Sequence, residues 1–137
     1  MGSNKDGKAG TFDFLGFTHY CGKSKRGRFR VKRKTSSKKQ KAKIKDFKMW
    51  IKRHRNTKVK DLIDMINVKL RGHYQYFGIT DNFKSISKFY RSVVKLLWKW
   101  LNRRSQRKSY TRESFKQLLE NYPILKPKVY VNIYDKT

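Results

Sequence analysis

The chain has 137 residues and carries 37 Lys and Arg against 9 Asp and Glu, a formal net charge of +28 at pH 7. Solubility does not require such an excess, so it indicates a polyanionic partner, and the phosphate backbone of a nucleic acid is the simplest one. No run approaches the roughly 18 apolar residues of a membrane span, and the N-terminus lacks the apolar core of a signal peptide, so we expect a cytoplasmic protein with no membrane partner.

The first expected element is a β-hairpin. Residues 12–20 (FDFLGFTHY) and 28–33 (RFRVKR) have the aromatic content and alternation of strands, and a segment rich in Gly and Lys joins them. The second strand should have one apolar and one cationic face, because its side chains alternate: Phe29 and Val31 with Arg28, Arg30 and Lys32. The cationic face is either a contact surface for an anion or a solvated edge whose charges prevent aggregation.

The most basic part of the chain overlaps and follows this hairpin. Residues 22–60 hold 19 Lys or Arg and a single acid, Asp46. Most of KTSSKKQK (34–41) should be loop, and a helix is expected from about residue 40 to residue 55. This helix has an apolar stripe around Ile44, Phe47 and Ile51. Its back is basic and carries Lys41, Lys45, Lys48, Lys52 and Arg55.

Two further long helices are expected. The second begins near Val59 and should end near Gly72, with Asp61 and Asp64 in its first turns, where negative charge suits the helix dipole. The third holds a 3.6-residue apolar period over 83–101. Its other faces and its end carry a series of basic residues: Lys84, Lys88, Arg91, Lys95, Lys99, Arg103 and Arg104.

The last part of the chain predicts a short helix and a strand. Thr111 is a suitable N-cap, Glu113 lies near the positive end of the helix dipole, and Pro123 stops the helix. KVYVNIY (128–134) alternates apolar and polar residues as a strand does, and the N-terminal hairpin is its expected partner.

The chemical groups of an active site are scattered. Phosphoryl transfer usually needs clustered carboxylates that hold two metal ions about 4 Å apart, whereas the closest acids, Asp61 and Asp64, are better explained by the helix dipole. Cys21 and His19 make at most half of a zinc site, and the sequence has no phosphate-binding Gly loop and no triad-like grouping. We therefore expect no enzyme activity, no metal and no cofactor.

Two segments resemble the distal part of a group II intron reverse transcriptase, also called an intron-encoded maturase. FDFLGF (12–17) is similar to the last conserved block of the reverse transcriptase region, and LRGHYQYF (70–77) is similar to an RGW-x-x-YF-like motif of the maturase-specific thumb, or X domain. The matching residues are Phe12, Phe14, Leu15, Gly16, Phe17, Arg71, Gly72, Tyr76 and Phe77. His73 stands where the family commonly has Trp, and the chain lacks the YADD-type catalytic block with its fingers and palm.

The resemblance, which runs from about Phe12 to Tyr122, implies a mainly α fold. We expect a thumb-like bundle of three helices preceded by a β-hairpin, with a short fourth helix and a C-terminal strand. The chain would then divide into an N-terminal extension (1–11), the β-hairpin (12–34), the helical thumb or X domain (35–122) and a C-terminal strand and tail (123–137).

The resemblance also implies an RNA-binding domain that supports intron splicing, mobility and reverse transcription. It would grip intron RNA or an RNA/DNA duplex through the backbone, together with a fingers–palm polymerase domain in the same or another chain. Tyr74 and Tyr76 are either stacking partners for unpaired bases or core residues. The expected phosphate contacts are Arg28, Arg30, Lys32, Arg33, Lys34, Lys41, Lys45, Lys48, Lys52, Arg71, Arg91, Arg103 and Arg104.

Two other functions fit the same composition. One is a DNA-binding module that uses the second and third helices as a helix-turn-helix around the turn FGITDN. The other is a basic structural subunit of a ribonucleoprotein, with a tail that RNA orders. Competition between structured RNA and duplex DNA separates the first of these from RNA binding, and protection of residues 22–41 from proteolysis only in the presence of RNA supports the second.

Overall fold

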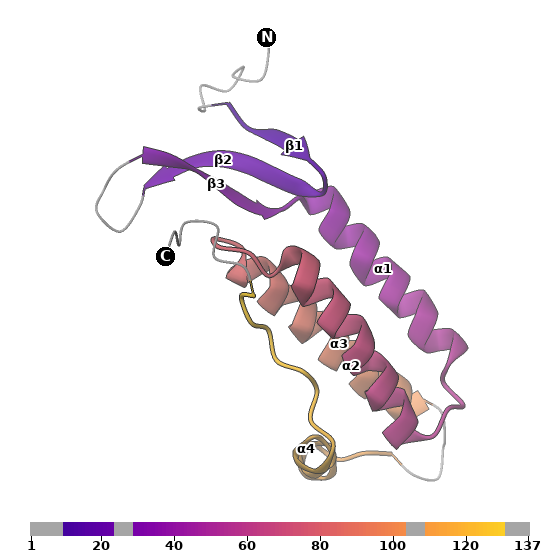
Figure 1. Cartoon of the computed structure of the whole chain (residues 1–137). Coiled ribbons are helices and arrows are strands. Elements are labelled where there is room, and N and C mark those ends of the chain that lie inside the picture. The colour runs from indigo at the N-terminus through magenta and orange to yellow at the C-terminus, as the bar shows by residue number, and fades with distance from the viewer. Residues whose placement is uncertain (1–9, 24–28, 104–108, 131–137) are drawn as a thin grey trace.

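The chain folds into a small antiparallel sheet followed by a group of helices (Figure 1). The structure, a computed structural model, describes residues 10–23, 29–103 and 109–130. Within these ranges the mainly helical fold expected from the sequence is confirmed. The elements are β1 (Phe12–Phe14), β2 (Phe17–Lys23), β3 (Phe29–Thr35), α1 (Ser37–Arg53), α2 (Val59–Phe77), α3 (Phe83–Arg103) and α4 (Arg112–Asn121).

The strands form one sheet in the order β1–β2–β3, with antiparallel neighbours. Alternation predicted a single strand over 12–20, but the chain reverses at Leu15 and Gly16, whose φ angles are 53° and 86°. Two positive φ angles in a two-residue loop are the geometry of a type I′ hairpin, which matches the twist of the flanking strands. β1 therefore folds back on β2, and Phe14 lies opposite Phe17.

Strand β3 leads directly into α1 through a capped junction. The prediction that 34–41 is mostly loop is wrong, because β3 runs to Thr35 and α1 starts at Ser37. Ser36 is the N-cap: its Oγ accepts a hydrogen bond from the Lys39 N–H at 3.1 Å, and its own N–H donates to the Gly16 carbonyl at 2.9 Å. An N-cap of this type stabilises a helix by about 1 kcal/mol, which fixes the helix start in a segment without an apolar period.

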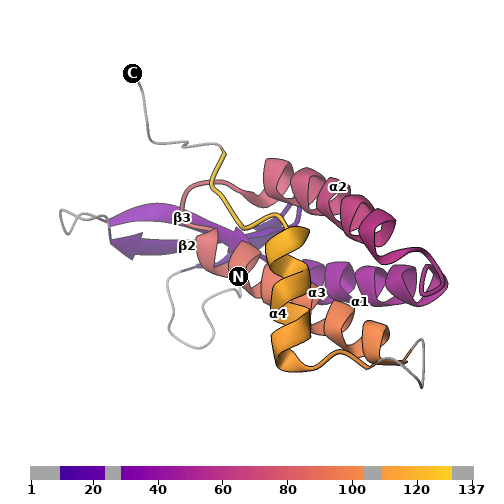
Figure 2. The same ribbon diagram turned by 90° about the horizontal axis from the view of Figure 1, so that it is seen from below.

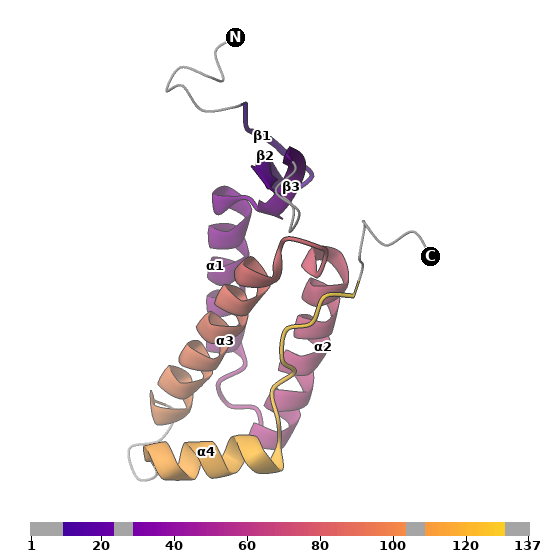
Figure 3. The same ribbon diagram turned by 90° about the vertical axis from the view of Figure 1, so that its left-hand side faces the viewer.

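Helix α3 packs against both α1 and α2, and the three helices form the core (Figure 3). The apolar periods that predicted these helices also identify their buried faces. Side chains that are at most 1% exposed come from all three helices: Ile51, Leu62, Ile63, Ile66, Leu70, Tyr74, Ile86, Val93, Leu97 and Leu101.

Helix α2 extends further than the sequence predicted. It was expected to end near Gly72, but it continues to Phe77 and ends at Gly78. The buried series continues past the glycine through His73, Tyr74 and Phe77, so packing outweighs the loss of about 1 kcal/mol that Gly causes inside a helix.

Asn82, in the turn between α2 and α3, joins the sheet to the helices. Its side chain is fully buried, and its Oδ1 accepts a hydrogen bond from the Thr35 N–H at 2.7 Å. Its Nδ2 donates to Thr35 Oγ1 and to the Phe77 carbonyl, both at 2.8 Å. Its own carbonyl accepts from the N–H groups of Ser85 and Ile86 at the start of α3. The side chain of Asn82 thus fixes the end of β3 and the end of α2, and its backbone carbonyl fixes the start of α3.

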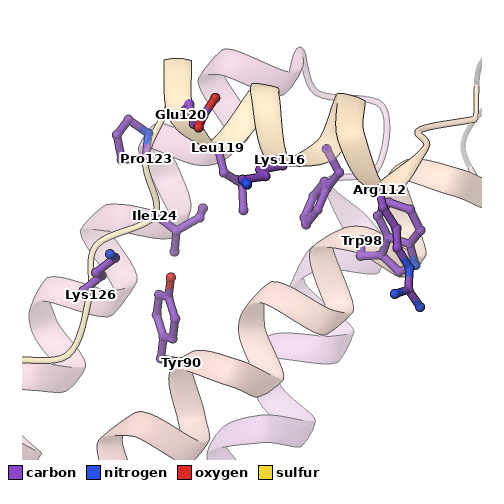
Figure 4. Close-up of a pocket in the computed structure, with 10 residues that line it drawn as sticks. Tyr90, Trp98, Arg112, Lys116, Leu119, Glu120, Pro123, Ile124 and Lys126 are labelled. Atoms are coloured by element: carbon purple, nitrogen blue, oxygen red, sulfur yellow. The ribbon is translucent and has the colours of Figure 1, made fainter.

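Helix α4 crosses the end of the bundle, and the chain then runs back along α2 (Figures 2 and 3). α4 begins at the predicted N-cap, Thr111, which forms a capping box with Ser114. Helices α3 and α4 and the residues after Pro123 enclose a mostly apolar hollow of about 470 Å³, in which Tyr90 points toward Ile124 (Figure 4).

The expected C-terminal strand is not found in the described part of the chain. Residues 122–130, which we call the returning segment, contain no strand, and 131–134 lie outside the described residues. Backbone groups of this segment form hydrogen bonds with α2 and its C-cap residue, and not with a neighbouring strand. They join Asn67 Nδ2 to the Pro123 carbonyl, the Leu125 N–H to Asn67 Oδ1, Tyr74 Oη to the Leu125 carbonyl, and the Tyr130 N–H to the Gly78 carbonyl.

Candidate nucleic-acid interface

Helix α1 carries basic side chains on both sides of its buried stripe of Gln40, Phe47 and Ile51. On one side four exposed lysines follow the i, i+4, i+7, i+11 spacing of a single helix face, and we call them the outer lysine row: Lys41, Lys45, Lys48 and Lys52. The row spans about 16 Å along the helix axis. Like charges at this spacing destabilise an isolated helix slightly, whereas a phosphate backbone would neutralise them.

Helix α3, which packs against α1, carries a second set of basic side chains. The two helices touch where Gln40 Nε2 donates to the Ser85 carbonyl at 2.8 Å, one turn before Lys88. Neither helix has an acid in its first turn, so no carboxylate there compensates the positive end of either dipole. The exposed basic residues of α3 are Lys84, Lys88, Arg91, Lys95 and Arg103.

The cationic face of β3 is only partly open. Arg30 is engaged, because its guanidinium lies 2.9 Å from Asp81 Oδ1. Lys34 is exposed and its ammonium lies 5.2 Å from the centre of the Tyr20 ring, a cation–π geometry. Arg33 lies opposite His19 on the other face of the sheet. The four described contacts expected in this region are therefore divided between two faces, and the fifth, Arg28, lies outside the described residues.

The second flank of α1 faces α2 across a groove of about 690 Å³, which we call the α1–α2 groove. α1 contributes Lys39, Lys43 and Asp46 to its lining. The other lining residues come from α2, from the turn between β1 and β2, and from the core: Lys69, Gly72, His73, Tyr76, Leu15, Gly16, Phe47, Phe77 and Phe89. The groove thus combines cations, an acid and aromatic rings.

His73 is the most buried polar side chain of this groove, at 7% exposed. Its ring lies flat on Phe89, with the centroids 3.9 Å apart and the planes 11° apart, and it also contacts Phe77. Its Nε2 has no hydrogen-bond partner. Burial, together with the nearby Lys43 charge, lowers the pKa of His73 from 6.5 to about 4, so the ring is neutral at pH 7.

The helices that carry these basic residues match a known family. Residues 37–119, more than half of the chain, match the family described as group II intron, maturase-specific domain. The chain belongs to this family. Comparisons with curated proteins and with solved structures gave no match. The matched region begins with the first residue of α1 and ends within α4, so it contains the outer lysine row and both helices that border the α1–α2 groove.

The maturase-specific domain places the predicted tyrosines and Arg71 in different environments. Tyr74 is a core residue: it is 0% exposed and its hydroxyl donates to the Leu125 carbonyl at 2.8 Å. Of the two roles expected for Tyr74, core packing is the one that agrees with this burial. Tyr76 is 49% exposed at the groove, and its hydroxyl donates to the Leu15 carbonyl at 2.6 Å. Arg71 is exposed on nearly the opposite side of α2 from His73.

Three cations of the groove were not among the predicted contacts: Lys39, Lys43 and Lys69. A signal for two of them is present in the sequence, because Lys39, Lys43 and Asp46 share one helix face at i, i+4 and i+7. The placement of Lys69 opposite them depends on how α2 packs, which spacing does not reveal. Among the predicted contacts, Arg104 lies outside the described residues.

The described residues of the domain contain no group of three or more His, Cys, Asp or Glu side chains that could hold a metal ion. None of the described helices is both long and apolar enough to cross a bilayer.

Proposed function

We propose that this maturase-specific domain grips intron RNA, or a template–primer duplex, through its phosphate backbone. In this role it supports splicing and reverse transcription without catalytic residues of its own. The A-form groove of such a duplex is recognised mainly by its shape and by contacts to phosphates and 2′-hydroxyls. Rows of cations on rigid helices provide contacts of this kind.

The outer lysine row is the observation that carries this proposal. Its four ammonium groups are exposed, they follow one side of a 17-residue helix, and α3, which also carries exposed cations, packs against that helix. Family membership supports the choice of RNA, because the family is defined by group II introns. The contacts we propose within the described residues are the outer lysine row with Lys32, Lys34, Arg91 and Arg103.

A salt titration of RNA binding tests the proposal. If six to ten phosphates are neutralised, affinity for a structured RNA should fall roughly 10³- to 10⁵-fold between about 50 and 200 mM salt. Replacing the whole outer lysine row by Gln should make the negative slope of log K against log salt shallower by about 3. Each phosphate contact contributes roughly 0.7 to 0.9 to its magnitude. A flat titration of the unaltered protein would contradict the proposal.

The matched control removes the same number of charges from other parts of the molecule. Lys60, Lys116, Lys126 and Lys128 are exposed and lie outside α1 and α3. Their replacement by Gln should change the slope by less than about 1. The same assay with duplex DNA as competitor addresses the helix-turn-helix alternative, which gains support if DNA displaces structured RNA at equal concentration.

We further propose that a fingers–palm polymerase domain covers the exposed apolar side chains of the sheet. Phe12, Phe14, Leu15 and Val31 are 59%, 58%, 67% and 47% exposed. Apolar side chains gathered in this way on a small sheet are typical of a protein interface. The resemblance of FDFLGF to the last block of the reverse transcriptase region supports this choice of partner.

An association experiment tests this partner. Phe12→Ser combined with Phe14→Ser should abolish binding to a separately produced fingers–palm segment of a group II intron reverse transcriptase, measured by size-exclusion chromatography with light scattering. Tyr122→Ser, an exposed aromatic residue beyond α4, is the control and should leave the association unchanged. Equal association of all three proteins would contradict a role for the sheet face.

A further inference from the structure

The α1–α2 groove contains two polar groups that the proposed grip on phosphates does not explain. His73 is 93% buried, and its Nε2 has no hydrogen-bond partner. A buried polar atom in this state carries an uncompensated desolvation penalty, which makes such atoms rare in folded proteins. A ligand that brings a hydrogen-bonding group into the groove would remove that penalty.

Asp46 is the second unexplained group. It is the only acid among residues 22–60, and it lines a groove whose other charged residues are Lys39, Lys43 and Lys69. Among the described residues no ion pair involves Asp46. A carboxylate repels phosphate, so a site for phosphate alone would not contain it. A carboxylate only accepts hydrogen bonds, and the edge of a nucleic-acid base supplies N–H donors.

The groove is large enough to hold a single base. Its volume of about 690 Å³ falls within the range of roughly 300 to 1,000 Å³ that is usual for small-ligand sites. Gly72 is exposed on the α2 wall, and a side chain added there would meet nothing within 4 Å. Tyr76, one turn further along α2, offers a half-exposed aromatic ring beside this open space.

We propose that the α1–α2 groove holds a single unpaired nucleotide of the bound RNA. The base enters over Gly72, where Tyr76 offers it a stacking surface, and directs its hydrogen-bonding edge toward Asp46 and His73. Lys39, Lys43 and Lys69 hold the adjoining phosphates. Guanine is the best match for the base, because it presents two neighbouring N–H donors to one carboxylate. This inference rests on the proposed function, since the nucleotide belongs to the RNA that the lysine rows grip.

The test compares two RNA hairpins that differ only in one bulged guanosine. The unaltered protein should bind the bulged hairpin roughly tenfold more tightly than the fully paired one, as expected for one stacked base. Gly72→Leu fills the open space without changing the charge, and Leu is a good helix former, so this variant should fold and lose the preference. Ala42→Leu adds similar bulk on the exposed side of α1 and should keep it.

A second variant protects the test against a folding defect in Gly72→Leu. Asp46→Ala alters an exposed residue, and it should also abolish the preference for the bulge while leaving the affinity for the paired hairpin within about twofold. The proposal is overturned if the unaltered protein binds both hairpins equally, or if both variants keep the preference. If instead binding to the paired hairpin proves independent of salt, the proposed grip on phosphates is what fails.

Discussion

Asn82 and His73 are two buried polar side chains of this domain that differ in their hydrogen bonding. Asn82 is 0% exposed, and both of its side-chain polar atoms have hydrogen-bond partners. His73 is almost as buried, at 7% exposed, yet its Nε2 has none. The satisfied residue joins three elements of the fold, whereas the unsatisfied one lines a groove that opens to solvent.

This difference separates a structural role from a functional one. A fully paired polar side chain in the core fixes one arrangement of its neighbours, because any other arrangement would leave buried groups without partners. A buried atom without a partner has no such effect and reduces stability. We therefore expect substitutions at Asn82 to act on folding, and substitutions around His73 to act on ligand binding and on the pH dependence of stability.

The largest effect should come from Asn82→Ala. The substitution leaves the Thr35 N–H and the Thr35 hydroxyl without their Asn82 partner in the core. It also removes one of the two hydrogen bonds to the Phe77 carbonyl, which still accepts from the Ile79 N–H. Unsatisfied buried groups cost about 1 to 3 kcal/mol each, so the free energy of unfolding should fall by about 4 kcal/mol. Urea denaturation measures it. Asn121→Ala, at the exposed end of α4, is the control and should change stability by less than about 0.5 kcal/mol.

The next largest effect is the loss of stability in acid that His73 causes. Its pKa is about 4 in the folded chain and 6.5 in the unfolded chain, so between these values the unfolded chain binds a proton that the folded chain does not. The free energy of unfolding should therefore fall as the pH drops from 6.5 toward 4, by up to about 3 kcal/mol. His73→Phe keeps a flat ring and should remove this part of the pH dependence. Urea denaturation across this pH range measures the free energy of unfolding of both proteins. If it changes with pH equally in the two, His73 is not the source of the pH dependence.

A smaller effect is expected from the ion pair between β3 and the α2–α3 turn. Arg30 and Asp81 lie 2.9 Å apart, with side chains 31% and 8% exposed. Asp81 also has a φ of 75°, a conformation that Asn tolerates well. Asp81→Asn should therefore lower the free energy of unfolding by about 1 kcal/mol through the loss of charge alone. A double-mutant cycle with Arg30→Ala should give a coupling energy of similar size, and additive effects would show that the pair contributes nothing.

The smallest effect should come from Tyr76→Phe. It removes the hydrogen bond from the Tyr76 hydroxyl to the Leu15 carbonyl, which ties α2 to the β1–β2 turn at an exposed site. The loss should be about 0.5 to 1 kcal/mol in thermal or urea unfolding. The ring remains, so affinity for the bulged hairpin should not change. A large loss of that affinity would mean that the hydroxyl, rather than the ring, contacts the RNA.

The sequence predicted the long helices well because their stability comes from apolar faces that repeat every 3.6 residues. The prediction from sequence failed where particular hydrogen bonds determine the structure. Leu15 is not a usual turn residue, so the reversal at Leu15 and Gly16 was not recognised. Residues 128–134 alternate like a strand, but in the part of them that the structure describes the Tyr130 N–H donates to the Gly78 carbonyl. Earlier in the returning segment, Leu125 bonds to Asn67 and Tyr74 of α2, and all these contacts span more than 50 residues of sequence.

The candidate site was predictable to a similar extent. The outer lysine row could be identified from spacing alone, because its members share one helix and one face. The α1–α2 groove could not, since its lining residues come from three helices and a turn. The environment of His73 is likewise created by Phe89, which is 16 residues away in the sequence and stacks on its ring.

The returning segment sets a practical limit on how short this protein can be made. The family match ends at residue 119, yet Ile124 beyond it is 4% exposed in the core. A side chain at Gly78 would lie 2.7 Å from the Lys128 carbonyl, which shows how closely the chain passes there. A recombinant domain cut at the family boundary would leave α2 uncovered, so expression vectors should encode the chain at least as far as Tyr130.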